Sequence, residues 1–110
     1  FDNHQRKSID ELSKLVDEKR FILTLDHRPC EYEENGKGKT NLLLSGHTHG
    51  GQLFPVNFID TFFKINDLNY GCVEIDSDTY AIVTSGVAGW AYPVKTSAPS
   101  EYVIINVMKK

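Results

Sequence analysis

Apolar and polar residues are arranged in blocks along this chain, and the first block predicts an amphipathic helix. Ser8 and Glu11 fit a capping box, in which a serine side chain satisfies a free N–H group of the first helical turn. Apolar residues then recur at helical spacing. Basic residues near Arg20 suit the C-terminal end of the helix dipole, so we predict a helix from Ser8 to Arg20.

Two short apolar runs have the length and composition of buried strands. They are residues 21–25 and 42–44, and each is too short for a buried helix. Pro29 follows the first run and prevents its continuation as a central strand. Between the runs, residues 31–39 are polar and glycine-containing, which predicts a turn of helix near Glu33 and then a loop.

The second half of the chain has the pattern of a β-rich region. Residues 70–75 and 79–84 predict antiparallel strands around a polar turn, and residues 102–107 predict a final strand. Residues 54–63 predict an irregular loop with a short helix, and residues 86–99 form a loop rich in Gly, Ala and Pro. The order of elements indicates an α/β (α+β) fold, with a mixed sheet, a covering helix and a sheet face that needs a partner.

Composition and charge narrow the class of protein without identifying it. The chain has 110 residues, a net charge of −3, 40% hydrophobic and 25% charged residues, which is ordinary for a soluble globular domain. It has no basic field that would indicate a nucleic-acid patch, and no apolar run approaches the ~20 residues of a membrane span. The two cysteines, Cys30 and Cys72, are expected to be free and partly buried. Because the chain lacks an initiator Met and opens on Phe1, we expect it to be a piece of a longer protein.

Histidines follow both predicted buried strands. His27 comes just after the first run, and His47 and His49 come just after the second. Ligands gather beyond the carboxyl ends of strands in open α/β sheets, so three imidazoles converge if these strands are neighbours. In extended backbone, His47 and His49 point to the same side, and neutral imidazole is a common ligand of transition metals. The alternative is a pair of hydrogen-bonded histidines in a loop.

The residues around these histidines resemble the signatures of a known family. Residues 46–52, Gly-His-Thr-His-Gly-Gly-Gln, resemble the last signature of the calcineurin-like metallophosphoesterases, Gly-His-x-His, and the Gly-Gly-Gln extension is similar to a bacterial subgroup. Residues 25–29, Leu-Asp-His-Arg-Pro, resemble the preceding signature, which centres on a histidine. Residues 85–90 and 99–101 resemble the closing loop and final strand of the subgroup, so the resemblance covers most of the chain from Ser8 onward.

The resemblance implies that residues 1–110 are the C-terminal portion of a single metallophosphoesterase domain, which is half of an α/β/β/α sandwich. It implies a site with two divalent metal ions, namely manganese, iron or zinc. Carried over by position, His27 and His47 would bind the second metal and His49 the first. The partners implied are a phosphoester substrate and the N-terminal half of the same domain. Localisation stays open between the bacterial cytoplasm and the membrane or cell envelope.

The other ligand signatures of the family are missing from this chain. They are Asp-x-His, Gly-Asp-x-x-Asp and Gly-Asn-His followed by Glu or Asp. Asp2-Asn3-His4 has the letters of the first, but only Phe1 precedes it, where the family has a buried strand. We therefore expect the intact protein to hydrolyse a phosphate monoester or diester and this chain alone to be inactive. The alternatives are a non-catalytic metal-binding or assembly module, or a phosphoesterase built on other histidine motifs.

Several further residues have two interpretations from the sequence. Arg28 is a candidate for binding substrate phosphate, because guanidinium matches phosphate geometry, or it is a solvated arginine. Gln52 is a candidate for orienting a ligand or substrate, although the sequence favours a structural hydrogen bond to backbone. Trp90 and Tyr92 either wall a substrate pocket or, as the sequence favours, pack in the core. Four phenylalanines also favour the core, with membrane-lipid contact as the alternative; they are Phe54, Phe58, Phe62 and Phe63.

Overall fold

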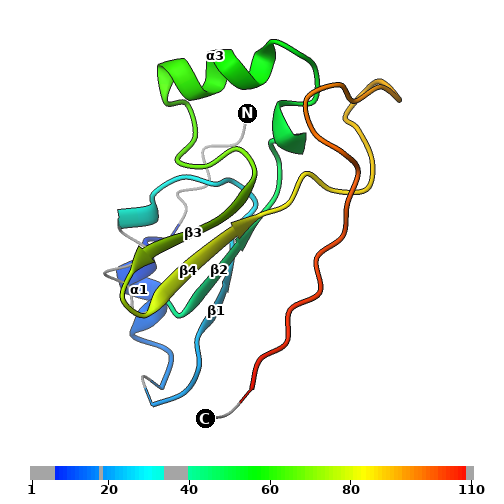
Figure 1. Ribbon diagram of the computed structural model, residues 1–110. Coiled ribbons are helices and arrows are strands. Elements are labelled where there is room, and N and C mark those ends of the chain that lie inside the picture. Colours follow the sequence, from blue (N-terminus) through cyan, green and yellow to red (C-terminus); the bar gives the residue numbers. More distant parts are fainter. Residues whose placement is uncertain (1–6, 18, 34–39, 109–110) are drawn as a thin grey trace.

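A four-stranded mixed sheet organises the chain (Figure 1). The computed structural model describes residues 7–17, 19–33 and 40–108. The strands are β1 (Leu23–Leu25), β2 (Leu42–Ser45), β3 (Gly71–Asp76) and β4 (Thr79–Val83), in the spatial order β1-β2-β4-β3. β2 runs parallel to both β1 and β4, whereas β3 is antiparallel to β4. The predicted α/β class with a mixed sheet is confirmed, as is the antiparallel pair.

The core lies on the two central strands of this sheet. Leu43 on β2 and Ala81 and Val83 on β4 are at most 1% exposed, and Tyr32 packs with them. β4 alternates between buried and more exposed residues, which is the pattern of a strand with one covered face. The strand predicted within residues 21–25 is present as β1, but the prediction that it is buried is wrong. Leu25 is 74% exposed, because β1 lies at the edge of the sheet.

The first helix is shorter than its sequence pattern predicts. α1 covers Ile9–Ser13, and the Glu11 N–H donates to the Ser8 side chain at 3.2 Å, so the predicted N-cap is confirmed. The predicted extension to Arg20 is wrong. The Asp17 carboxylate accepts from the Lys19 N–H at 3.1 Å, and its backbone carbonyl accepts from the Arg20 N–H at 3.0 Å. Aspartate that bonds neighbouring backbone groups in this way competes with helix formation.

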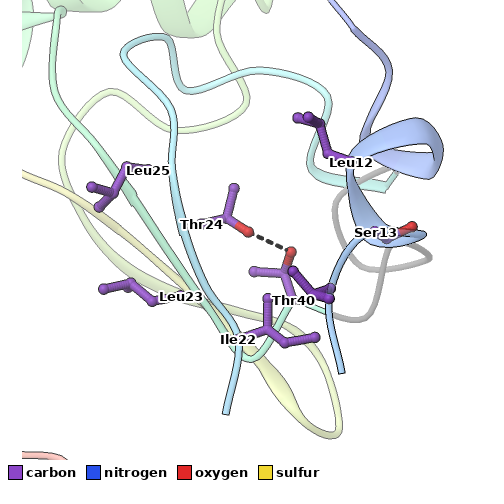
Figure 2. Close-up of a pocket in the computed structure, with 8 residues that line it drawn as sticks. Leu12, Ser13, Ile22, Leu23, Thr24, Leu25 and Thr40 are labelled. Carbon is purple, nitrogen blue, oxygen red and sulfur yellow. Dashed lines mark hydrogen bonds between the residues drawn. The ribbon is translucent and has the colours of Figure 1, made fainter. Parts of the chain in front are cut away.

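α1 and β1 enclose a shallow apolar pocket of about 240 Å³ (Figure 2). Leu12 and Val16 contribute from the helical side, and residues 22–25 contribute from the strand. The floor carries a hydrogen bond of 2.8 Å between the hydroxyls of Thr24 and Thr40. The lining holds no histidine, cysteine or carboxylate, so the pocket is an incompletely covered apolar face and not a chemical site.

Two helical elements lie beyond the carboxyl ends of the parallel strands. The 3₁₀ helix η1 (His49–Gly51) follows β2, and α3 (Val56–Phe63) confirms the short helix expected within residues 54–63 (Figure 1). Tyr32 and Glu33 are helical as expected, while the rest of that segment, residues 34–39, lies outside the described residues. None of the described helices is both long and apolar enough to span a membrane.

Two predictions about the apolar residues of the second half are wrong. Residues 102–107 form no strand, because no neighbouring strand in the described part of the chain pairs with them, and they lie exposed. The four phenylalanines expected in the core are each at least 64% exposed. Trp90 and Tyr92 are likewise 73% and 68% exposed, because the loop that carries them packs through its backbone and not through these rings. Of the two free cysteines, Cys30 is half-buried and Cys72 is exposed.

Candidate metal centre

Two of the three candidate histidines contact each other. β1 and β2 are parallel neighbours, and His27 and His47 each lie two residues beyond the end of one of these strands. The Nδ1 atom of His47 lies 2.9 Å from the Nε2 atom of His27, and the ring centroids are 4.6 Å apart. The sequence predicted that three imidazoles converge, and this contact confirms the prediction for His27 and His47.

An open pocket of about 300 Å³ adjoins this pair at the carboxyl ends of the parallel strands. His27 and Asp26 line it from the β1 side, and Ser45 and Gly46 line it from the β2 side. The Ser45 Oγ atom is buried and has no hydrogen-bond partner in the part of the chain that the structure describes.

The backbone of the histidine motif is not extended, which corrects the geometry assumed from the sequence. His47 and His49 have φ angles of 68° and 50°, in the left-handed region. The Thr48 N–H donates to the Gly46 carbonyl at 2.8 Å and closes a tight turn around His47. Non-glycine residues in this region are strained and cluster at functional sites, and histidine adopts it more readily than most. The turn, and not an extended strand, aims His47 at His27.

The surroundings of His47 favour its neutral form. The His47 side chain is exposed, but the slight burial it has, followed by the neighbouring His27, Arg28 and His49, lowers its pKa below the ordinary value. Neutral imidazole is the form that binds a metal ion. Arg28 itself is exposed and close enough to contribute to this shift, so its charge lies near the histidine pair.

His49 is held by the loop that follows β4. Its Nδ1 atom lies 3.0 Å from the Ala88 carbonyl oxygen. A carbonyl oxygen only accepts hydrogen bonds, so Nδ1 carries a proton, and in the neutral ring Nε2 is the nitrogen with the lone pair. Metal-binding histidines in proteins are held in this way by a backbone carbonyl or a carboxylate. The Ala88 carbonyl has no signal in the sequence, because any residue can supply it.

The arrangement fits part of a metal site. Two nitrogens that share a metal at about 2.1 Å are about 3.0–3.4 Å apart, and the His27–His47 separation of 2.9 Å is close to this range. In residues 7–17, 19–33 and 40–108, no group of three or more His, Cys, Asp and Glu side chains is arranged to hold an ion. These residues thus offer two imidazoles for one ion and a separately held His49, and a complete centre requires further ligands.

Gln52 makes the structural hydrogen bonds that the sequence favours. Its Nε2 atom donates to the carbonyls of Trp90 at 2.8 Å and Tyr92 at 3.3 Å, and its Oε1 atom accepts from the Trp90 N–H at 2.6 Å. Sequence reasoning missed the other anchor of the same loop. The Lys95 ammonium donates to the carbonyls of Ser85, Gly86 and Pro99, and an isolated lysine in a loop gives no such signal.

Comparison with known proteins finds relatives along most of the chain. An uncharacterized metallophosphoesterase of Aquifex aeolicus is 36% identical over 101 residues, which cover 91% of this chain and 38% of that protein. An uncharacterized metallophosphoesterase of Campylobacter jejuni is 39% identical over 89 residues, covering 80% of this chain and 23% of that protein. A transmembrane protein with metallophosphoesterase domain of Danio rerio is 32% identical over 91 residues, covering 81% and 20%.

These matches have two further features. The chain spans well under half the length of each of these relatives, at 38%, 23% and 20%. The relatives come from bacteria and from an animal, so the likeness is not restricted to a bacterial subgroup. No protein-family model matches the chain, and no solved structure matches it at a significant level.

Proposed function

Because this chain belongs to the metallophosphoesterase family, we propose that it supplies one half of a two-metal phosphoesterase centre in a longer protein. The observation that carries the proposal is the contact of His27 and His47 at neighbouring strand ends, with His49 held separately beside them. In this assignment residues 1–110 are the C-terminal portion of one metallophosphoesterase domain. The remainder of the domain provides the carboxylates and the asparagine that these residues lack.

The three histidines have different roles in the proposed centre. His27 and His47 would hold the second metal, and His49 would hold the first through Nε2, the nitrogen that the Ala88 contact does not use. Two divalent cations, whether manganese, iron or zinc, would polarise a phosphoryl group and balance charge on the attacking and leaving oxygens. Arg28 is exposed beside the pair, which supports a role in orienting the substrate phosphate.

The reaction we propose is hydrolysis of a phosphate monoester or diester by the intact protein, and the chain alone is inactive. An assay of both on an aryl phosphate and an aryl phosphodiester with manganese tests this. In the longer protein, His47→Ala and His49→Ala should each lower turnover more than about 100-fold, beyond the loss typical of groups outside the ligand set. His4→Ala, at a residue outside those that the structure describes, serves as the control and should leave turnover unchanged.

Each outcome of this assay decides between the candidate functions. Turnover that survives both histidine substitutions would overturn the assignment of the ligands. Metal binding by the longer protein without turnover on either substrate would favour the non-catalytic metal-binding module. Metal-dependent turnover by the 110-residue chain, lost in His49→Ala, would contradict the requirement for further ligands.

The exposed surface of α3 supports a lipid contact near the same centre. Asn57 packs against η1, where a Cβ on Gly51 would lie 2.5 Å from the Asn57 Cβ, and Asn69 donates to the Thr61 hydroxyl at 3.5 Å. The polar side of this helix therefore faces the protein, and its apolar side faces outward. We define the α3 apolar face as Val56, Phe58, Ile59, Phe62 and Phe63, which are 44–82% exposed. Apolar surface of this kind marks interaction sites, and we propose that it contacts a lipid surface.

A further inference from the structure

We propose that Gln52 is a positioning residue for the metal ligand His49, acting through the loop that carries Ala88. The inference rests on the proposed function, since it assigns a purpose to the hydrogen bonds around one of the three histidines. Gln52 touches His49 only through the backbone, where its N–H donates to the His49 carbonyl at 3.2 Å; its side chain bonds Trp90 and Tyr92, not the His49 ring. It fixes the backbone segment whose carbonyl selects the tautomer and orientation of the His49 ring.

The first step is the bond between His49 and Ala88. The Nδ1–H of His49 donates to the Ala88 carbonyl at 3.0 Å. The methyl side chain of Ala88 makes no hydrogen bond that could hold this carbonyl in place. The segment around Ala88 is a loop without regular secondary structure, and the Ala88 and Trp90 side chains are exposed. The direction of the His49 ring therefore depends on whatever fixes this backbone.

Gln52 fixes that backbone from both sides of the loop. Its side-chain amide makes one donor and one acceptor bond to Trp90, two residues beyond Ala88, and a second donor bond to Tyr92. Its backbone carbonyl accepts from the N–H groups of Thr96 at 2.8 Å and Ser97 at 3.2 Å on the returning part of the loop. One residue thus ties the outgoing and returning segments of the loop to the end of η1.

The packing of Gly89 shows how closely the amide approaches the loop. A Cβ on Gly89 would lie 2.8 Å from the Tyr92 carbonyl oxygen and 3.2 Å from the Gln52 Nε2 atom. Only a residue without a side chain leaves room for these bonds. Gln52 itself has a φ angle of 35°, which glutamine rarely adopts, so the backbone is strained at the residue that makes these contacts.

The experiment uses the full-length protein with metal removed, because the tautomer of His49 is readable there without activity. Long-range ¹H–¹⁵N NMR of the imidazole should find the Nδ1–H tautomer in the wild type. Gln52→Met keeps the side-chain volume and loses all three amide bonds, and it should convert His49 to a mixture of tautomers. Gln52→Glu keeps only the acceptor for the Trp90 N–H, and it provides the same test if the Met variant does not fold.

Thr96→Val is the matched control. The Thr96 hydroxyl accepts from the Phe54 N–H at 2.9 Å, so its loss removes one loop bond on the returning segment and spares the Ala88 side. This variant should lower Tm while His49 stays in the Nδ1–H form. If the Gln52 variants also lower Tm and leave the His49 tautomer unchanged, Gln52 is only a brace for the loop and the proposal is overturned.

Metal affinity gives a second reading that separates this inference from the proposed function. Loss of a group that orients a ligand weakens metal binding about 10- to 100-fold. We therefore expect a tenfold or greater rise in the manganese Kd in Gln52→Met and recovery of kcat at saturating manganese. If His49→Ala leaves manganese binding unchanged, the proposed centre is wrong whatever Gln52 does. If His49→Ala loses binding and Gln52→Met does not, only the positioning role is wrong.

Discussion

At the scale of single residues, the chemistry of this chain depends on which ring nitrogens are available. His47 faces His27 through Nδ1, whereas His49 uses Nδ1 to contact a carbonyl and leaves Nε2 as the nitrogen without this bond. Histidines that lie two apart in sequence thus present different nitrogens, because the turn around His47 and the loop at Ala88 orient each ring separately. This difference supports their assignment to different metals.

The separate roles predict how the 110-residue chain itself binds metal. We expect one weak zinc site per chain, formed by the His27 and His47 nitrogens, because two imidazoles without carboxylates hold an ion loosely. Titration calorimetry should find this site lost in His47→Ala and retained in His49→Ala, which is the matched substitution at the other histidine of the motif. Tight binding of two ions would contradict the requirement for ligands from elsewhere.

A second residue-scale prediction concerns the carboxylate that holds the chain after β4. Glu101 accepts from the Ser85 N–H at 3.0 Å, the Thr84 hydroxyl at 3.1 Å and the Tyr70 hydroxyl at 3.0 Å. The Ser85 N–H has the largest effect on the pKa of Glu101 and lowers it; burial opposes this, and the two hydroxyls and the charge of Lys95 add to the lowering, so that the pKa lies below its usual value. The folded state therefore favours the ionised form of this carboxyl.

This depressed pKa fixes the sign of a pH effect. The stability contributed by Glu101 is full above the pKa of an unfolded glutamate and is lost as the pH falls through the lower folded value. Glu101→Gln should lower Tm by a few degrees at pH 7, and the difference from wild type should shrink on acidification. Glu74→Gln, at an exposed carboxylate on β3, is the control. A Glu101→Gln deficit that grows as the pH falls would refute the assignment.

At the scale of secondary-structure elements, the orientation of α3 is reversed: a helix that covers a core turns its apolar side inward, whereas α3 turns its apolar side outward. Its polar residues face η1 and Asn69, and the α3 apolar face points away from the protein. Periodicity in the sequence predicts that such a helix is amphipathic, but it does not decide which side turns inward. The contacts of Asn57 and Thr61 decide this.

The orientation of α3 predicts that its phenylalanines matter for lipid contact and not for stability. Phe58→Ser and Phe62→Ser together should leave Tm within a few degrees of wild type and abolish flotation of the full-length protein with phosphatidylcholine vesicles. Leu15→Ser, at a residue 78% exposed outside α3, should float as the wild type does. As a contrast in stability, Leu43→Ala truncates a fully buried side chain and should lower the free energy of unfolding by about 2–5 kcal/mol. Flotation that survives both phenylalanine substitutions would contradict the lipid contact.

At the scale of the whole molecule, the sheet has more apolar surface than this chain covers. The pocket between α1 and β1 is open, and Leu25 on the edge strand is 74% exposed. Residues 102–107 are apolar except for Asn106, as in a strand, and yet they pair with no strand in the described part of the chain. Each of these features fits a domain whose other half supplies the missing strands and cover.

Hydrogen exchange should detect this missing cover. In the full-length protein we expect the amides of residues 102–107 to exchange slowly, because a neighbouring strand would bond them. In the 110-residue chain the same amides should exchange within the shortest labelling time, while those of β2 and β4 stay protected in both. Equal exchange of residues 102–107 in the two proteins would refute a strand there.

The sequence by itself determined the local features whose cause lies in neighbouring residues. The Ser8 cap, the short apolar strand at β2 and the antiparallel pair β3–β4 all follow from patterns a few residues long. The histidine motif was also readable, because its residue types and spacing are local. The length of α1 was not, since the bonds made by Asp17 compete with the helix and periodicity does not register them.

Only the tertiary structure decided which surfaces are covered and which atoms meet. Burial depends on what packs against a residue from elsewhere in the chain. The sequence pattern therefore predicted a core position or a strand for several residues that are exposed, namely the phenylalanines of α3, Trp90 and residues 102–107. The contact of His27 with His47 requires that β1 and β2 be neighbours. The sequence alone did not show that these two strands are adjacent. The Ala88 carbonyl that selects the tautomer of His49 is a backbone atom, and only folding brings it to that ring.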